Sequence, residues 1–163
     1  MSKQTFEITD TGEGMLMGNM KKKFDLVGEE MNTTVPTYGF QLLRHLLLPE
    51  LLGEEEEMIL YWAGKALARK LTDEDITDLV HFFEESSWGT LSLVKEKGTE
   101  QHYELIAPLM DKTRPLTLEC GFLAQWTERK VGFITEAAYE LKRKKPLTFR
   151  IIVKWDKSDP IGI

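Results

Sequence analysis

Residues 116–155 read LTLECGFLAQWTERKVGFITEAAYELKRKKPLTFRIIVKW, and this stretch decides the class of fold. Apolar residues recur at helical spacing around Cys120, which predicts an amphipathic helix over residues 116 to about 130. Apolar and polar side chains then alternate over residues 133–141 and again over 147–155, on either side of a basic turn. The stretch therefore predicts a helix followed by an antiparallel hairpin.

The preceding residues predict three more helices and a second hairpin. Apolar runs over 38–48 and 54–71 indicate two helices, and a third is expected over 72–85, with Thr72 as its N-cap. Two alternating segments then flank a turn at residues 97–99. Runs of helices and antiparallel strands indicate an α+β fold, here a four-stranded antiparallel sheet of two hairpins packed against about four helices.

The chain divides into two regions of different composition. Residues 1–31 hold four glycines, four methionines before Met31 and scattered charge, with no sustained period of 3.6 or 2. We expect these residues to form a flexible N-terminal extension. Residues 32–163 carry the periodic patterns and are expected to fold as a single α+β domain.

Charge, cysteine content and hydropathy indicate which ligands and which cellular location to expect for the protein. A net charge of −6 argues against nucleic-acid binding, and the basic residues 142–145 are expected to be a solvated turn. A single cysteine, Cys120, and a polar N-terminus without a signal-peptide pattern favour a cytoplasmic protein. The longest apolar stretch, residues 38–52, contains charges and a proline, so no transmembrane segment is expected.

No pattern in the sequence identifies catalytic chemistry, a metal site or a cofactor. The three histidines lack the spacing of metal ligands, and no glycine-rich phosphate loop is present. An enzyme would have to use Cys120, His81 or Glu136, brought together by folding. We expect Cys120 to be a buried core residue and Glu136 to pair with a partner such as Arg150 on the adjacent strand. The sequence thus favours a protein that is not an enzyme.

Small residues in the second expected helix suggest a ligand cavity. Small side chains at helical spacing let another backbone approach closely, and beside aromatic residues they can also leave room for a ligand. The leading hypothesis is a non-enzymatic protein that holds an apolar, acyl-like molecule between helices and sheet. The expected lining residues are Ala63, Gly64, Leu67, Phe122 and Trp126.

The alternative hypothesis is a dimeric interaction or scaffold module with a solid core and no ligand. The first expected helix is too apolar for a helix that exposes one face to solvent, so another surface should cover its remaining apolar side chains. The simplest such surface is that of a second copy in a symmetric homodimer. The expected interface residues are Phe40, Leu43, Leu47 and Leu51.

Four segments resemble one family of proteins. YWAGKALAR (61–69), FFEESSWGTL (82–91), LECGFLAQ (118–125) and VKWDKSDP (153–160) are similar to the YslB-like family of small, largely uncharacterised cytoplasmic proteins from Gram-positive bacteria. The resemblance covers about residues 35–160. More distantly, the order of elements resembles TRAPP vesicle-tethering subunits, vinyl-reductase-like domains and haem-based nitric oxide sensors.

The wider resemblance implies an α+β fold, often with a dimer made by the first helices and an apolar internal cavity. Glu136 matches the glutamate of the vinyl-reductase-like pattern, but Tyr139 and Thr148 stand near where its cysteines would be. The tyrosine-serine-arginine motif of the haem sensors is missing. A thiol-based, metal-based or haem-based role therefore does not follow from the resemblance.

Overall fold

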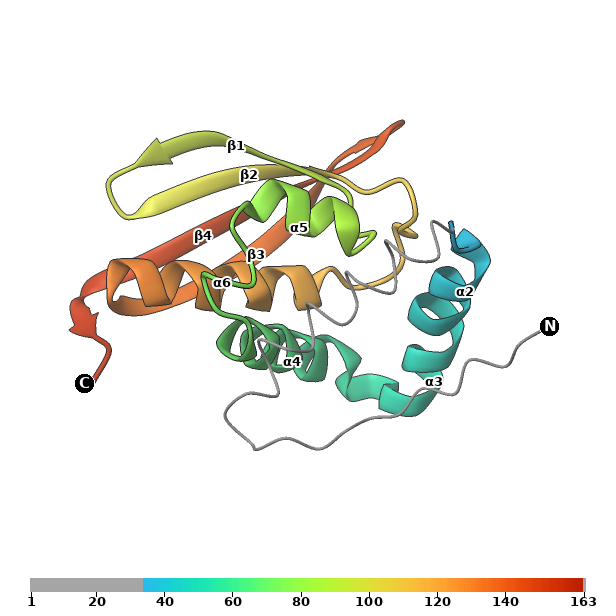
Figure 1. The fold of residues 1–163 in the computed structure, drawn as a ribbon, viewed down its shortest axis with the longest axis horizontal. Helices are drawn as coiled ribbons and strands as arrows, with labels where there is room; N and C mark the ends of the chain where they lie inside the picture. The colour runs from blue at the N-terminus through green and yellow to red at the C-terminus, as the bar shows by residue number, and fades with distance from the viewer. Residues whose placement is uncertain (1–33, 163) are drawn as a thin grey trace. The chain divides into compact units, whose positions relative to one another are not determined.

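The computed structural model describes residues 34–162, which belong to one compact unit, Thr34–Ile163 (Figure 1). The expected flexible extension, residues 1–31, lies outside the described residues. The first two residues of the expected domain 32–163 lie outside them as well.

The sheet consists of two antiparallel hairpins, as the sequence predicts. β1 (Thr90–Lys97) pairs with β2 (Glu100–Ile106), and β3 (Phe133–Lys144) pairs with β4 (Leu147–Pro160). The two hairpins join through β2 and β4, so the strand order is β1-β2-β4-β3 and β1 and β3 are the edges. The expected α+β class with a four-stranded antiparallel sheet is confirmed.

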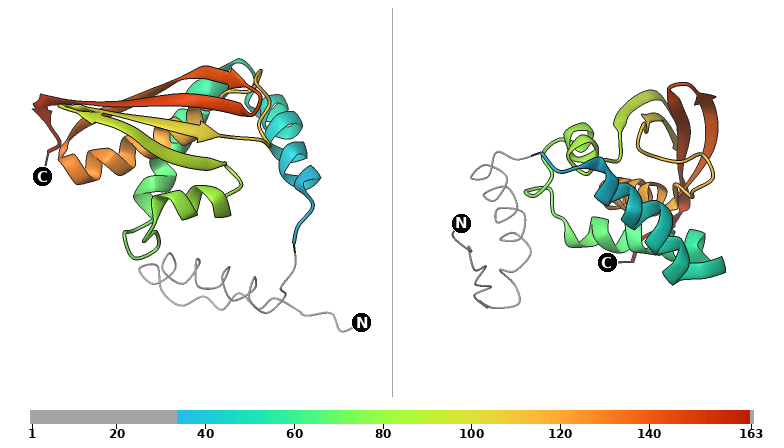
Figure 2. Two further views of the ribbon diagram at one scale, coloured as in Figure 1. Left: turned by 90° about the horizontal axis from the view of Figure 1, so that it is seen from above. Right: turned by 90° about the vertical axis from the view of Figure 1, so that its right-hand side faces the viewer.

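The sheet carries helices on one face. α4 (Glu56–Lys70), α5 (Leu79–Glu85) and α6 (Thr117–Val131) lie on the same side of it (Figure 2). Because successive side chains of a strand point to opposite faces of the sheet, one set of side chains packs against these helices. These inward-facing residues are buried, namely Leu91, Tyr103, Leu105, Phe149, Ile151 and Val153. No helix among the described residues covers the opposite face, which we call the outer face.

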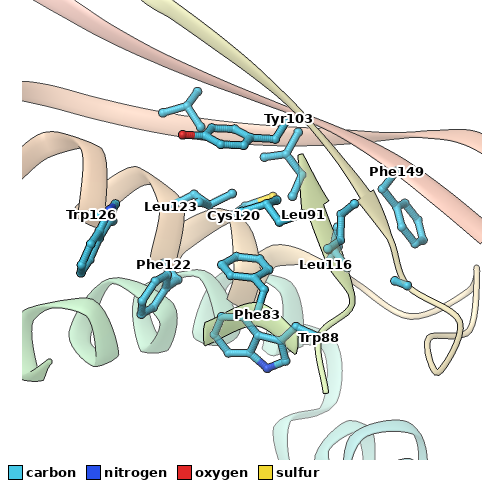
Figure 3. Close-up of a cluster of buried hydrophobic side chains, with 14 of the residues drawn as sticks. Phe83, Trp88, Leu91, Tyr103, Leu116, Cys120, Phe122, Leu123, Trp126 and Phe149 are labelled. Atoms are coloured by element: carbon cyan, nitrogen blue, oxygen red, sulfur yellow. The ribbon is translucent and has the colours of Figure 1, made fainter. Parts of the chain in front are cut away.

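The core is built around α6, in which every residue from Glu119 to Glu128 is buried. Phe122 occupies its centre and stacks on Phe82 of α5, with ring centroids 4.8 Å apart. Trp88 and Trp126 also contact Phe122 (Figure 3), and both are core residues, as expected for tryptophan. The solid aromatic cluster holds α5 and α6 against the sheet.

Side chains from the helices cap the outward edge of β3. Thr135 N–H donates to Glu128 Oε2 at 3.0 Å, and Ala137 N–H donates to Tyr61 Oη at 3.2 Å. An open strand edge is a template for unwanted pairing with another chain. These two contacts block that pairing over the first half of β3.

The third helix is shorter than the sequence predicts. Thr72 and Asp75 do exchange the hydrogen bonds of a capping motif, since Thr72 N–H donates to Asp75 Oδ2 at 2.7 Å and Asp75 N–H donates to Thr72 Oγ1 at 3.3 Å. The chain nevertheless leaves helical geometry after this turn, and α5 starts at Leu79. Asp78 is its N-cap and accepts from Val80 N–H at 2.9 Å. The hydrogen bonds of a helix N-cap therefore form at Thr72, although α5 begins only at Leu79.

The first helical segment spans residues 37–52 and contains a wide turn. α2 (Thr37–Gln41) leads into a π-helical turn, η1 (Leu42–Leu47), and then into α3 (Leu48–Leu52). Pro49 lies within this segment, and the helix continues through it. A proline ring clashes with the carbonyl four residues before it in an α-helix, and the wider turn relieves that clash. A short 3₁₀ turn, η2 (Gly53–Glu55), connects to α4.

α4 and α6 cross with their backbones in contact. A Cβ on Gly64 would lie 2.0 Å from the carbonyl oxygen of Leu118, and a Cβ on Gly121 would lie 1.9 Å from the carbonyl oxygen of Tyr61. The small-residue surface of α4 therefore serves a close helix approach, as the sequence suggests, and the glycines of both helices are required for it.

We expect Gly64→Ala and Gly121→Ala to destabilise the protein, because each added methyl group would force the helices apart. Overpacking of this kind costs about 1–3 kcal/mol or more. Gly39→Ala is the matched control, since Gly39 is also helical and has nothing within 4 Å of the added Cβ; it should be neutral or stabilising by about 0.5–1 kcal/mol. Urea denaturation at one protein concentration measures all three. Equal stability of Gly39→Ala and Gly64→Ala would contradict the crossing.

Candidate functional site

The helical segment 37–52 turns a charge toward the core and most of its leucines toward solvent. Arg44 is its one buried residue, 5% exposed. Burying four leucines would be worth about 1.5–3 kcal/mol for each side chain. The leucines around Arg44 are nevertheless exposed, namely Leu42, Leu43, Leu46 and Leu47.

An ion pair explains this orientation. Arg44 Nη2 donates to Glu119 Oε2 at 2.8 Å, and Glu119, in the first turn of α6, is fully buried. Two charges that have left water must be paired, because either one alone would be strongly destabilising. The pair therefore anchors the π-helical turn to α6 and fixes which side of the segment faces inward.

Further polar groups flank this pair. Arg114 Nη1 lies 3.5 Å from Glu56 Oε2 at the start of α4. Burial lowers the pKa of His45 below its ordinary value, while the Asp111 carboxylate opposes the shift. His45 is therefore neutral at pH 7, and Arg44 supplies the positive charge of the π-helical turn.

Large apolar side chains are exposed along residues 37–52 and at the start of α4, and we call this set of side chains the apolar face. Nine large side chains contribute, each 39–67% exposed. Patches beyond a few hundred Å² are uncommon on monomeric proteins and mark interaction sites. The apolar face consists of Tyr38, Leu42, Leu43, Leu46, Leu47, Leu51, Met58, Ile59 and Trp62.

The apolar face contains three of the four expected dimer residues. Leu43, Leu47 and Leu51 are exposed on it. Phe40 points the other way and packs against the core cluster. Trp62 belongs to the same set, since its side chain is 56% exposed.

The five expected cavity residues differ in their surroundings. Ala63 is exposed, whereas Gly64 is buried against the backbone of α6. Leu67 is half-buried and packs on the core cluster. Phe122 and Trp126 stack on each other with ring centroids 6.1 Å apart. At the crossing of α4 and α6, backbone atoms fill the room that the small residues leave.

A hollow lies elsewhere, at the open end of the β3–β4 hairpin. This groove has a volume of about 600 Å³ and shares no residue with the expected cavity. Charged side chains and two apolar ones line it, among them Ile134, Glu136, Lys154 and Trp155. Its polar lining does not suit an acyl chain.

The three residues considered for catalysis lie in separate places. Cys120 is buried in the core, and burial, with a smaller effect of Glu119, raises the pKa of its thiol far above the ordinary range. His81 is exposed on α5, 3.1 Å from Glu85. Glu136 is exposed on β3. A thiolate nucleophile is not available at Cys120 near pH 7.

The expected pairing of Glu136 with Arg150 is wrong. The register of β3 and β4 places Glu136 opposite Lys154, whereas Arg150 stands opposite Glu140. The carboxylate that Arg150 approaches is that of Glu104 on β2, at 3.9 Å. Register depends on the hairpin turn and its bulges, which the alternation pattern does not report.

Residues 34–162 contain no cluster of three or more His, Cys, Asp or Glu side chains that would suit a metal ion. None of the helices within these residues has the length and apolar character needed to cross a bilayer.

The fold defines the class to which the protein is similar. A crystal structure of a vinyl-4-reductase family protein from Methanocaldococcus jannaschii superposes with a TM-score of 0.61 at 16% identity, covering 93% of this chain and 100% of that one. A trafficking protein particle complex subunit 3 from Naegleria fowleri, covalently bound to palmitic acid, superposes with a TM-score of 0.43 at 13% identity, covering 92% and 100%. The protein thus shares its α+β fold with the vinyl-4-reductase family protein.

Sequence comparison shows the family. Residues 37–154 match the family described as "Protein of unknown function (DUF2507)". The chain is 37% identical over 153 residues to the uncharacterized protein YslB of Bacillus subtilis (strain 168), covering 87% of this chain and 100% of YslB. It is also 32% identical over 104 residues to the uncharacterized protein MJ1642 of Methanocaldococcus jannaschii, covering 61% and 65%. The chain belongs to the DUF2507 family, so the resemblance to YslB-like proteins is confirmed.

Sequence reasoning missed the residues that orient the apolar face. Arg44 stands among leucines, and the sequence alone shows it only as one of the charges that interrupt an apolar run. Glu119 occurs next to Cys120 on the buried side of α6. The signal was present as a charge between apolar residues in each of two helices, since buried charges occur in pairs.

We expect Arg44→Met alone, or Glu119→Leu alone, to destabilise the protein by about 3–5 kcal/mol, because each leaves an uncompensated buried charge. The double variant Arg44→Met/Glu119→Leu should recover most of this loss. A double-mutant cycle by urea denaturation, at one protein concentration, measures the coupling. Single variants that each cost less than about 1 kcal/mol would show that the pair behaves as an exposed one.

Cys120 should not react with iodoacetamide in the native protein at pH 7.5, because its thiol is buried and its pKa is raised. In urea the same thiol should be alkylated at the rate of an ordinary cysteine. Mass spectrometry of timed samples gives both rates. Equal rates in the two states would mean that Cys120 is accessible in the native fold.

Proposed function

We propose that this protein is a non-enzymatic interaction module that pairs with a second copy of itself through the apolar face. The observation that carries the proposal is the orientation of residues 37–52, with Arg44 inside and the leucines outside. Such an arrangement forfeits several kcal/mol of hydrophobic stabilisation in an isolated chain. A partner that covers the leucines restores that stabilisation.

Size favours a second copy as the occupant. A standard protein interface removes about 800 Å² of surface from each partner. Nine large side chains that are 39–67% exposed present apolar area of this order. The face is therefore large enough for a stable dimer.

Charge favours the same occupant. Two chains of net charge −6 repel each other, so self-association requires a patch that carries little charge. Arg44 is paired inside the protein and His45 is neutral, so neither side chain places a positive charge on the surface of the π-helical turn. In a two-fold pairing each residue meets the same surface on the partner, and leucine meeting leucine is complementary.

The apolar-ligand hypothesis receives less support. The α4–α6 contact closes the space beside Gly64, and an acyl chain would have to enter elsewhere. Native mass spectrometry would reveal such a ligand as added mass on the purified protein.

A catalytic role is also disfavoured, because Cys120, His81 and Glu136 lie apart. The cytoplasmic location expected from the single cysteine suits an interaction module.

We expect the full chain, of 18.8 kDa, to sediment as a dimer at micromolar concentration. Leu47→Glu should place an unpaired charge in the interface and weaken pairing by about 3 kcal/mol or more, roughly a hundredfold in Kd. The matched control is Val94→Glu on β1, because Val94 is 49% exposed and Leu47 is 47% exposed. Sedimentation velocity measures both variants. A monomeric wild-type chain, or equal effects of the two substitutions, would refute the proposal.

A further inference from the structure

Positive charge gathers at the tip of the β3–β4 hairpin. The stretch 142–150 contains five cations and no acidic residue, in a chain whose net charge is −6. This tip extends past the ends of β1 and β2 (Figure 1). No described helix covers the adjoining outer face of the sheet (Figure 2). The cations are therefore open to a ligand from solvent.

A β-bulge directs two consecutive cations to the same side. The register of β3 and β4 shifts between Leu141 and Arg143, which leaves Lys142 as the extra residue. Strict alternation would send Lys142 and Arg143 to opposite faces. Instead both contact the carboxylate of Glu104, which lies on β2. Bulges of this kind re-aim side chains and occur frequently at functional sites.

The cations outnumber the acids that face them. Lys142 hydrogen-bonds to Glu104, but Arg143 Nη2 and Arg150 Nη2 lie 3.7 and 3.9 Å from that carboxylate, beyond hydrogen-bond distance. The Nε–H of Arg150 is buried and has no acceptor among the described groups. Glu140, opposite Arg150 in the register, is the other nearby acid. Three cations and two acids leave a net positive charge, to which the two lysines of the turn add.

We propose that Lys142, Arg143 and Arg150 bind a phosphate group in its dianionic form. Two guanidinium groups with unused donors match the oxygen atoms of phosphate, and a lysine adds a third charged contact. Loss of solvent contact lowers the pKa of Lys142, and the charges of Arg150 and Arg143 lower it further. A bound anion would offset this crowding. The group would be a free phosphate monoester or the monoester headgroup of a phospholipid, as in phosphatidic acid.

Calorimetric titration of the full chain with inorganic phosphate, at constant ionic strength set by chloride, tests the site. Arg143→Gln/Arg150→Gln should weaken binding at least about tenfold. The matched control is Lys154→Gln/Lys157→Gln, which removes the same charge from β4 farther from the tip; Lys154 is paired with Glu100 there. Glu104→Gln should strengthen binding, because it removes the carboxylate that competes for the cations.

The sign of the Glu104→Gln effect separates a phosphate site from a structural ion-pair network. In a network, this substitution would lower thermal stability without improving phosphate binding. Co-sedimentation with phosphatidylcholine vesicles, with and without phosphatidic acid, distinguishes a lipid headgroup from a free phosphate. Binding to inorganic phosphate or to these vesicles supports the proposal if it requires Arg143 and Arg150. Binding to neither probe, or binding unchanged in the Arg143→Gln/Arg150→Gln variant, would overturn it.

Discussion

Arg44 and Glu119 form an ion pair that is sealed from solvent, and the orientation of residues 37–52 depends on it. Such a pair adds little net stability, since desolvation offsets most of the attraction. Its effect is on specificity, because any rotation of the segment that buried the leucines would separate the two charges. The π-helical turn widens the helix at this point and continues into α3 through Pro49. The same local geometry therefore holds the arginine inside and the leucines outside.

The crossing of α4 and α6 fixes the position of α6, which carries Glu119 of this ion pair. Gly64 and Gly121 let the two backbones touch, and Phe122 then meets Phe82, Trp88 and Trp126 in a filled aromatic cluster. A core packed in this way leaves α6 little freedom to move. Glu119 is consequently held in position for Arg44. The same arrangement thus gives a closely packed core and an exposed apolar face. It favours association with a second copy of the chain over storage of a ligand.

Much of the fold could be predicted from the sequence, because alternation and helical spacing report which residues are buried. Residues 116–155 predicted α6 and the β3–β4 hairpin, and the small residues of α4 predicted a close helix approach. Three features depended on contacts between distant residues and could not be read in this way. In 37–52 leucines occur on every side, so periodicity could not select the inward face. The register that separates Glu136 from Arg150 and the bulge at Lys142 arise from strand pairing.

The proposed dimer requires that a second copy of the chain covers the leucines of residues 42–51. Hydrogen–deuterium exchange of the full chain at two protein concentrations, one far above and one far below the dissociation constant, tests this claim directly. We expect the amides of residues 42–51 to exchange more slowly at the higher concentration, while those of β1 are unchanged. Exchange of residues 42–51 that is independent of concentration would contradict the account.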